Sequence, residues 1–427
     1  MPGFATDPID PRYPSVVSSS TLGRPFWTLW TAFTASNFAD GLSLVAMPLL
    51  AIGLTDDARL VAAVAVFQYL PFLIIGLPAG IVLDRFDRRW IAVTAQVVRA
   101  IVLGALAFVV LADEATIESL MLASFLIGAS EVMTDGGLPA LVRDLVDPLQ
   151  LELANARLSA TQTVSNSFVG PPLGALLFQV DSAVPLLGSA AASLVSVGLL
   201  IRLPGSYQPE QSVESTPFRT RATVGLRYVW AHEVLRPLAL TVATFAFVGA
   251  AGNGVFVVLV TERFGLGSVG FGLLISVDAV ASVLTSFFVA RLISRTSHSW
   301  SMRLSIVCFT AGALLFGLTT VATVAFLAAV VNGISDPTWN IVSATVRQRL
   351  VPDEVFGRMM TAYLFISWGM KPVGALIGGM VAEAWGAQWV SVGSAIAVGS
   401  LFVLARPMFH RVDAAMQAAN DGAGSRA

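Results

Sequence analysis

Ionisable side chains within long apolar runs are the residues of this 427-residue chain that could do chemistry. Asp40 lies in the run 27–52, and Glu131 and Asp135 lie four residues apart in the run 119–142, on one face of any helix. Arg99, in the run 91–112, lies nine residues after Trp90, or about 14 Å deep at 1.5 Å per residue. A group of buried carboxyls beside a cation can exchange protons when a substrate or a helix movement changes their surroundings. We therefore predict a proton-coupling cavity, with the polar Asn37 one turn before Asp40.

Other roles remain open for these residues. Asp40 could instead make a hydrogen bond at a helix contact, and Arg99 could belong to a structural ion pair. In the second half of the chain, Asp278, Asp336 and Lys371 are the charges within apolar runs. Lys371 is the only lysine of the chain, and it could pair with Asp336 or Asp278 or contact a substrate. Because each such charge is costly in a membrane, all three are predicted cavity residues.

The composition indicates a membrane protein. Hydrophobic residues make up 56% and charged residues only 12% of the chain, and the mean hydropathy is +0.77. One cysteine and three dispersed histidines argue against a metal site. The net charge of −2 does not favour nucleic-acid binding. No phosphate-binding loop or hydrolase motif is present, so we expect no enzyme and no cofactor beyond the proton gradient.

A membrane-spanning helix needs about 20 mostly apolar residues. The sequence predicts an all-α integral membrane fold with twelve such helices, of which the ninth and tenth are the least clearly separated. The predicted spans are 27–52, 60–83, 91–112, 119–142, 154–179, 183–203, 237–261, 269–293, 302–320, 322–346, 358–384 and 388–406.

The basic residues predict the orientation of these spans, because cytoplasmic loops are rich in Lys and Arg. With the amino terminus inside, only Arg59 and Arg263 of the 25 Lys and Arg residues fall in external loops. Both termini are therefore predicted to be cytoplasmic. One lysine beside 24 arginines is typical of a GC-rich bacterial genome, so the membrane is expected to be the inner membrane of a bacterium.

An internal repeat predicts two pseudo-symmetric six-helix bundles. Pro172-Leu-Gly-Ala-Leu recurs 200 residues later as Pro372-Val-Gly-Ala-Leu (372 − 172 = 200). Asp135 and Asp336 are separated by nearly the same distance in sequence (336 − 135 = 201). Parallel repeats of this kind are typical of alternating-access carriers. The predicted parts are a cytoplasmic tail (1–25), the first bundle (26–203), a cytoplasmic linker (204–236), the second bundle (237–406) and a polar cytoplasmic tail (407–427).

The linker ends in a segment, 218–236, in which arginines alternate with apolar residues. This pattern favours an amphipathic helix at the membrane interface, although an unstructured linker remains an alternative.

A short charged loop follows the second span. It contains Gly80, Asp84, Arg85, Arg88 and Arg89. Arginine can bind a carboxylate through two parallel hydrogen bonds, so the loop could latch the ends of neighbouring helices in one conformation. Alternatively, it could simply anchor the chain at the cytoplasmic surface.

This loop resembles the signature of the major facilitator superfamily, Gly-x-x-x-Asp-Arg-x-Gly-Arg-Arg/Lys, with Asp87 in place of the second glycine. Gly170, Pro171 and Gly174 resemble the antiporter motif of its exporters. Further segments, including Asn37–Gly41, 139–156 and 351–359, are similar to the macrolide-efflux and enterobactin-exporter branch. The resemblance implies a proton-coupled carrier in which Asp84 lies near Arg358 and Arg88 pairs with Asp144.

Together these observations predict a proton antiporter that exports an amphipathic small molecule, such as a drug, a macrolide or a siderophore-like compound. The expected partners are this substrate, protons and membrane lipid, and the carrier is expected to be a monomer. A proton-coupled uptake symporter is one alternative, and a non-transporting receptor or scaffold on the same fold is another. Charged residues in both halves disfavour the second alternative, since their insertion is costly.

Overall fold

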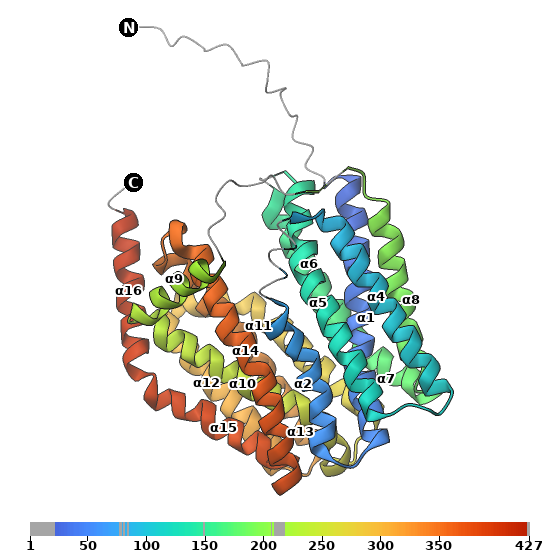
Figure 1. Ribbon diagram of the computed structural model, residues 1–427. Coiled ribbons are helices and arrows are strands. Elements are labelled where there is room, and N and C mark those ends of the chain that lie inside the picture. Colours follow the sequence, from blue (N-terminus) through green and yellow to red (C-terminus); the bar gives the residue numbers. More distant parts are fainter. Residues whose placement is uncertain are drawn as a thin grey trace.

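The computed structural model describes residues 22–76, 79, 82, 85–147, 150–205, 207–208 and 218–424, and these residues contain helices and no strands. Helices from the first half of the chain pack mainly with one another, and those from the second half do the same. We call these sets the N-terminal group and the C-terminal group. Figure 1 shows them side by side, with the start of α1 (Arg24) and the end of α16 (Gly424) at the same end of the molecule.

The N-terminal group is built on α1, which contacts α8, α7 and α5, while α4 packs between α5 and α8. Its helices are α1 (Arg24–Leu54), α2 (Ala58–Ile74), α4 (Arg88–Leu111), α5 (Ile117–Leu145), α6 (Leu151–Gln162), the π-helical η2 (Thr163–Val169), α7 (Gly170–Val180) and α8 (Val184–Ile201).

In the C-terminal group, α13 packs on α11 and α12, and α10 packs on α14 and α15. The helices are α9 (Phe218–Ala231), α10 (Leu235–Val258), η3 (Leu259–Arg263), α11 (Ser268–Arg295), α12 (His298–Leu318), α13 (Ala322–Leu350), α14 (Asp353–Trp385), α15 (Ala387–Leu404) and α16 (Arg406–Gly424).

Nine helices in the described part of the chain are long and apolar enough to cross a membrane. They are α1, α4, the first part of α5, α8, α10 with η3, α11, α12, the later part of α14, and α15. The chain is therefore a multi-pass membrane protein. The short apolar helix α2, the series α6–η2–α7 and the more polar α13 occupy the three other predicted spans.

The predicted fifth span is not one regular helix. Its central turns, Thr163–Val169, are π-helical and lead directly into Gly170-Pro171-Pro172. Pro172 has no N–H to donate to the carbonyl of Phe168, so that carbonyl needs another partner. The hydroxyl of Ser276 on α11 donates to it at 3.1 Å. A polar side chain of the C-terminal group thus satisfies the backbone at this break.

The predicted amphipathic segment is helical only as far as Ala231, where α9 ends. A turn at His232 then directs the chain into α10. The Nδ1 atom of His232 accepts hydrogen bonds from the backbone N–H groups of Val234 and Leu235, at 3.1 and 3.3 Å. Burial lowers the pKa of His232, which favours the neutral imidazole that can accept them.

The segment predicted as a polar tail, 407–427, is largely helical, because α16 covers most of it. Met408, Phe409, Val412 and Met416 are buried against the C-terminal group, at the spacing of one helical face. The carboxylate of Asp413 also accepts hydrogen bonds from the backbone N–H and hydroxyl of Ser299, at the start of α12. The predicted N-terminal tail lies almost entirely outside the described residues.

The two groups meet at the end of the molecule away from the start of α1 and the end of α16, where α2 packs on α14 and α7 on α11 (Figure 1). The carboxylate of Glu383 on α14 accepts a hydrogen bond from the backbone N–H of Ala58, the first residue of α2, at 3.0 Å. One turn along each helix, Gly379 lies so close to Ala62 that an added β-carbon would be 2.5 Å from the Ala62 Cβ. These contacts close this end of the molecule.

Candidate functional site

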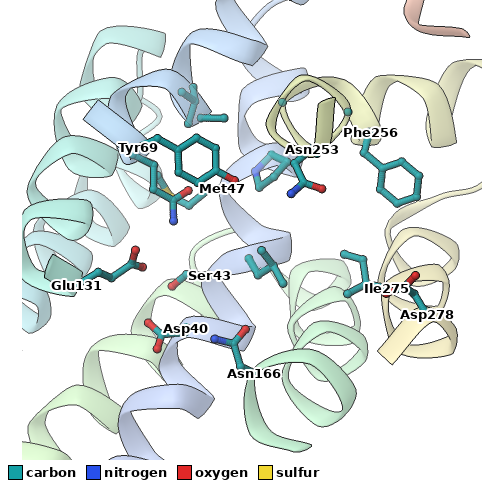
Figure 2. Close-up of a pocket in the computed structure, with 18 of the residues that line it drawn as sticks. Asp40, Ser43, Met47, Tyr69, Glu131, Asn166, Asn253, Phe256, Ile275 and Asp278 are labelled. Carbon is teal, nitrogen blue, oxygen red and sulfur yellow. The ribbon is translucent and has the colours of Figure 1, made fainter. Parts of the chain in front are cut away.

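A cavity of about 540 Å³ lies between the two groups. In Figure 2, Asp40, Ser43 and Glu131 project toward it from the N-terminal group, and Asn253, Ile275 and Asp278 lie across from them. All of the predicted cavity residues except Lys371 line it. They are Asn37, Asp40, Arg99, Glu131, Asp135, Asp278 and Asp336.

Asp40 and Arg99 form an ion pair between α1 and α4. The Arg99 side chain is only 3% exposed and lies in the helix packing, whereas Asp40 is 19% exposed and faces the cavity. One turn earlier on each helix, the amide of Gln96 donates to the hydroxyl of Ser36, which fixes the two helices beside the pair. Asp40 is therefore a cavity carboxylate anchored to a buried cation.

Glu131 and Asp135 extend this acidic wall along α5, as their spacing predicts. Both interact electrostatically with Asp40 and with Arg99, and Glu131 also makes a side-chain hydrogen bond with Gln68 of α2. Three carboxyl groups thus share one guanidinium. Like charges in a poorly solvated site repel strongly, so the number of protons bound here depends on what other cation is present.

The opposite wall carries the acids of the C-terminal group. Asp278 on α11 and Asp336 on α13 both line the cavity and interact electrostatically with each other. Asn332, one turn before Asp336, also faces the cavity. The acidic residues are therefore distributed over both groups, as the sequence repeat predicts.

Lys371 does not pair with Asp336 or Asp278. Its ammonium lies over the rings of Trp368 and Tyr69, at 4.3 and 5.4 Å from their centroids. Its charge acts instead on Glu131 and Asp135. The reason is the position of α14, which packs on α10 and α2 rather than on α11 or α13.

In the charged loop, the ion pair expected between Arg88 and Asp144 is present, at 3.1 Å. Arg89 donates to the carbonyl of Leu203, and its guanidinium lies over the ring of Trp90. Arg85 is exposed. Gly80 and Asp84 lie outside the described residues, and so does the side chain of Arg358.

Asp87, the departure from the superfamily signature, has a clear structural role. Its carboxylate accepts the backbone N–H of Arg89 at 2.9 Å and therefore caps α4. It also accepts the backbone N–H of Tyr207 at 3.2 Å. The side chain thus joins the loop to the segment that follows α8.

In the predicted antiporter motif, Gly170 permits a close contact between α7 and α1. A β-carbon at this position would lie 2.5 Å from the Cα atom of Gly41, one residue after Asp40. A β-carbon at Gly174 would lie 2.9 Å from the carbonyl oxygen of Leu42. Pro171 is buried beside them. The motif therefore positions the helix that carries Asp40.

Besides Asn37, further uncharged polar residues complete the site, and three of them were not predicted from the sequence. Gln68, Tyr69 and Asn166 line the cavity, and Tyr69 makes a side-chain hydrogen bond with Asn253 of α10. That contact joins the two groups across the cavity. Amide and hydroxyl groups inside the predicted spans were the available signal, but such residues also occur at ordinary helix contacts.

A cavity between two groups of membrane helices, lined by acids from both, is the arrangement of a secondary transporter. The family model described as "Transmembrane secretion effector" matches residues 21–424. The chain belongs to this family of the major facilitator superfamily.

Curated relatives extend over most of the chain. The multidrug efflux pump Tap of Mycolicibacterium fortuitum is 24% identical over 372 residues, which cover 84% of this chain and 89% of that protein. Macrolide efflux protein A of Streptococcus pyogenes is 21% identical, over 84% of this chain and 90% of its own length.

Solved structures show the same fold. The nucleoside transporter NupG superposes with a TM-score of 0.74 at 16% identity, covering 91% of this chain and 99% of its own. A bacterial homologue of the human lysosomal transporter Spinster gives 0.71 at 15% identity, covering 91% and 97%. The prediction of an all-α, major-facilitator-like fold is therefore confirmed, whereas the count of twelve helices stays a prediction; these identities are too low to transfer a substrate.

Proposed function

We propose that this protein is a proton antiporter that exports an amphipathic small molecule from a bacterial cell by alternating access. The named functions of its relatives, multidrug and macrolide efflux, support export of drug-like or macrolide compounds. The cavity volume of about 540 Å³ lies within the range of about 300–1,000 Å³ that is typical of ligand pockets. A siderophore-like substrate fits the same chemistry.

The twelve-helix, two-bundle topology is part of this proposal. Adding α2, α6–η2–α7 and α13 to the nine apolar helices gives six crossings in each group. The groups then correspond to bundles 26–203 and 237–406, joined by the linker that contains α9. We expect the carrier to act as a monomer, because its cavity lies between the two groups of a single chain.

The distribution of arginines supports a cytoplasmic location for both termini and for α9 and α16 in the inner membrane. The contacts between α2 and α14 at Ala58, Ala62, Gly379 and Glu383 then lie at the outer surface. In this state the outer end is closed, and substrate would enter the cavity from the cytoplasm.

The Asp40–Arg99 ion pair beside Glu131 and Asp135 is the observation that carries the antiport proposal. The three acids outnumber the two cations that act on them, Arg99 and Lys371, so the site can bind a proton or a cationic substrate group to reduce the repulsion. Competition for these carboxyls couples the two fluxes: a substrate from the inside displaces protons, and protons from the outside later displace the substrate.

Inverted membrane vesicles test this mechanism. Their interior corresponds to the outside of the cell, is acidified, and contains a pH-sensitive dye. We expect macrolides or other amphipathic compounds to accumulate inside while the dye reports loss of protons from the lumen. Asp40→Asn and Asp135→Asn should each reduce this proton response at least about tenfold, since a lost catalytic proton carrier typically costs about 10²–10⁴ in rate.

Asp113→Asn is the matched control, because Asp113 is exposed in a loop between α4 and α5. If both cavity variants retain the wild-type proton response, these acids are not the coupling groups. Substrate accumulation together with proton influx in right-side-out vesicles would indicate the uptake symporter. If the wild type moves no compound in either direction, the receptor or scaffold alternative is favoured.

A further inference from the structure

The ammonium of Lys371 lies between aromatic rings that come from both groups of helices. Its ammonium nitrogen is 4.3 Å from the ring centroid of Trp368 on its own helix and 5.4 Å from that of Tyr69 on α2. Phe72, one turn after Tyr69, lies against Trp368 with the ring centroids 3.9 Å apart and the ring planes tilted by 41°. Aromatic faces around a cation are the chemistry that recognises an organic ammonium group.

Carboxylates complete the surroundings of this ammonium. Glu131 and Asp135 interact with it electrostatically. Five acids line the adjoining cavity, Asp40, Glu131, Asp135, Asp278 and Asp336, and Arg99 is the only Lys or Arg among its described lining residues. Without the positive charge of Lys371 nearby, these five carboxyl groups would be compensated by Arg99 alone, and a strongly negative potential would result when they are ionised.

The ammonium is nevertheless held loosely. In the described part of the chain it makes no ion pair within 4.0 Å and no hydrogen bond, although it has three N–H donors. A lysine side chain is a flexible four-carbon arm with a compact charge at its end. The charge can therefore leave the rings without breaking a directional contact.

We propose that the ammonium of Lys371 holds the place of the substrate's own cationic group. The proposal rests on the proposed transport function and specifies the substrate as an amphiphile with one ammonium or other monovalent cationic group. The substrate cation displaces Lys371 from Trp368 and Tyr69 and takes over its interaction with Glu131 and Asp135. Lys371 is then a specificity residue that limits the charge the cavity accepts.

A binding measurement on the purified full-length protein in lipid nanodiscs tests this role without requiring transport. The probes are tetraphenylphosphonium, a lipophilic monovalent cation, and 1-N-phenylnaphthylamine, an uncharged amphiphile. Removing the competing charge in Lys371→Met should lower the Kd for tetraphenylphosphonium at least about fivefold, the scale of one cation–aromatic contact. The Kd for the uncharged probe should stay within about twofold.

Lys371→Arg keeps the charge and is the matched control, with an expected wild-type Kd for tetraphenylphosphonium. Trp368→Leu added to Lys371→Met should reverse most of the gain in affinity for the cation and leave the uncharged probe unaffected. If Lys371→Met binds tetraphenylphosphonium no more tightly than the wild type, the proposal is overturned. Equal loss of both probes would also overturn it, because that result assigns Lys371 a purely structural role.

The outcome is separable from that of the vesicle experiment. Failure of wild-type transport with tighter cation binding by Lys371→Met would refute the antiport function and support the competing lysine. Normal proton-coupled transport with unchanged binding would do the opposite.

Discussion

The buried guanidinium of Arg99 is the most constrained charge in the cavity wall. Its side chain is 3% exposed, and Asp40 is its ion-pair partner. The Nε and Nη2 atoms have no hydrogen-bond partner among the described residues. Asp40 is therefore the direct counter-charge of Arg99 and also has access to the cavity, while Glu131 and Asp135 act on Arg99 without a direct ion pair.

We expect Asp40→Asn to destabilise the folded protein by about 3–5 kcal/mol, because it removes the direct ion-pair partner of a buried charge. The double variant Asp40→Asn, Arg99→Gln should recover part of this loss, since both charges are then absent. Thermal unfolding of the detergent-solubilised proteins measures the difference.

Asp135→Asn is the control for that series, because Asp135 has no direct ion pair among the described residues. It should destabilise the protein much less than Asp40→Asn. Equal losses for the two single variants, or no recovery in the double variant, would contradict a charge-compensation role for Asp40.

Charged residues of the site could be predicted because charge inside an apolar run is costly and therefore conspicuous. This reasoning identified Asp40, Arg99, Glu131 and Asp135, which the fold brings to one wall. It did not identify Gln68 or the partners of Lys371. Uncharged polar groups cost less in a membrane, so their presence in an apolar run does not mark them as functional. The partners of Lys371 could not be predicted because they depend on which helices pack against α14.

At the scale of the elements, the contact of α1 with α7 requires small residues. A β-carbon at Gly170 would lie 2.5 Å from the Gly41 Cα and 2.6 Å from the carbonyl oxygen of Ser165. These neighbours are backbone atoms, which cannot turn away as a side chain can. We expect Gly170→Ala to force the helices apart, to cost about 1–3 kcal/mol and to impair transport by moving Asp40.

Gly104→Ala is the matched control on α4, because no atom lies within 4 Å of its added β-carbon. This variant should be neutral or slightly stabilising, since alanine favours helix more than glycine does. Comparing the unfolding temperatures and transport rates of the two variants tests the close contact. Similar behaviour of both would show that α1 and α7 can separate without consequence.

Hydropathy predicted most helices of the chain, but not their interruptions or the role of the C-terminal segment. The π-helical turns of η2 depend on the Gly-Pro-Pro sequence and on the hydroxyl of Ser276 from another helix. The helix α16 is too polar to resemble a membrane span. In the sequence, the only sign of its apolar face is the helical spacing of residues such as Phe409 and Val412. The structure shows that these residues are buried.

At the scale of the whole molecule, the sequence cannot specify which end of the cavity is closed. Alternating access requires at least two packings of the same helices, and both must be compatible with one sequence. The contacts of Ala58 and Ala62 with α14 define the packing observed here. The repeat and the apolar runs predict the two groups of helices but not this choice.

A reversible cross-link at the closed end can test whether the two groups must separate there. An ideal β-carbon at Gly254 on α10 lies 3.5 Å from the Cβ of Ala62 on α2, within the range of a disulfide. We expect Ala62→Cys with Gly254→Cys, in a Cys308→Ser background, to form this bond on oxidation. Transport should then stop, because the outer end can no longer open, and it should return when the bond is reduced.

The control is Ser305→Cys with Ser335→Cys, which joins α12 to α13 within the C-terminal group, where the hydroxyl oxygens are 3.0 Å apart. That bond should leave transport nearly unchanged, since each group moves as a unit. Continued transport with the 62–254 bond verified by mass spectrometry would rule out separation of the groups at this end as a required step.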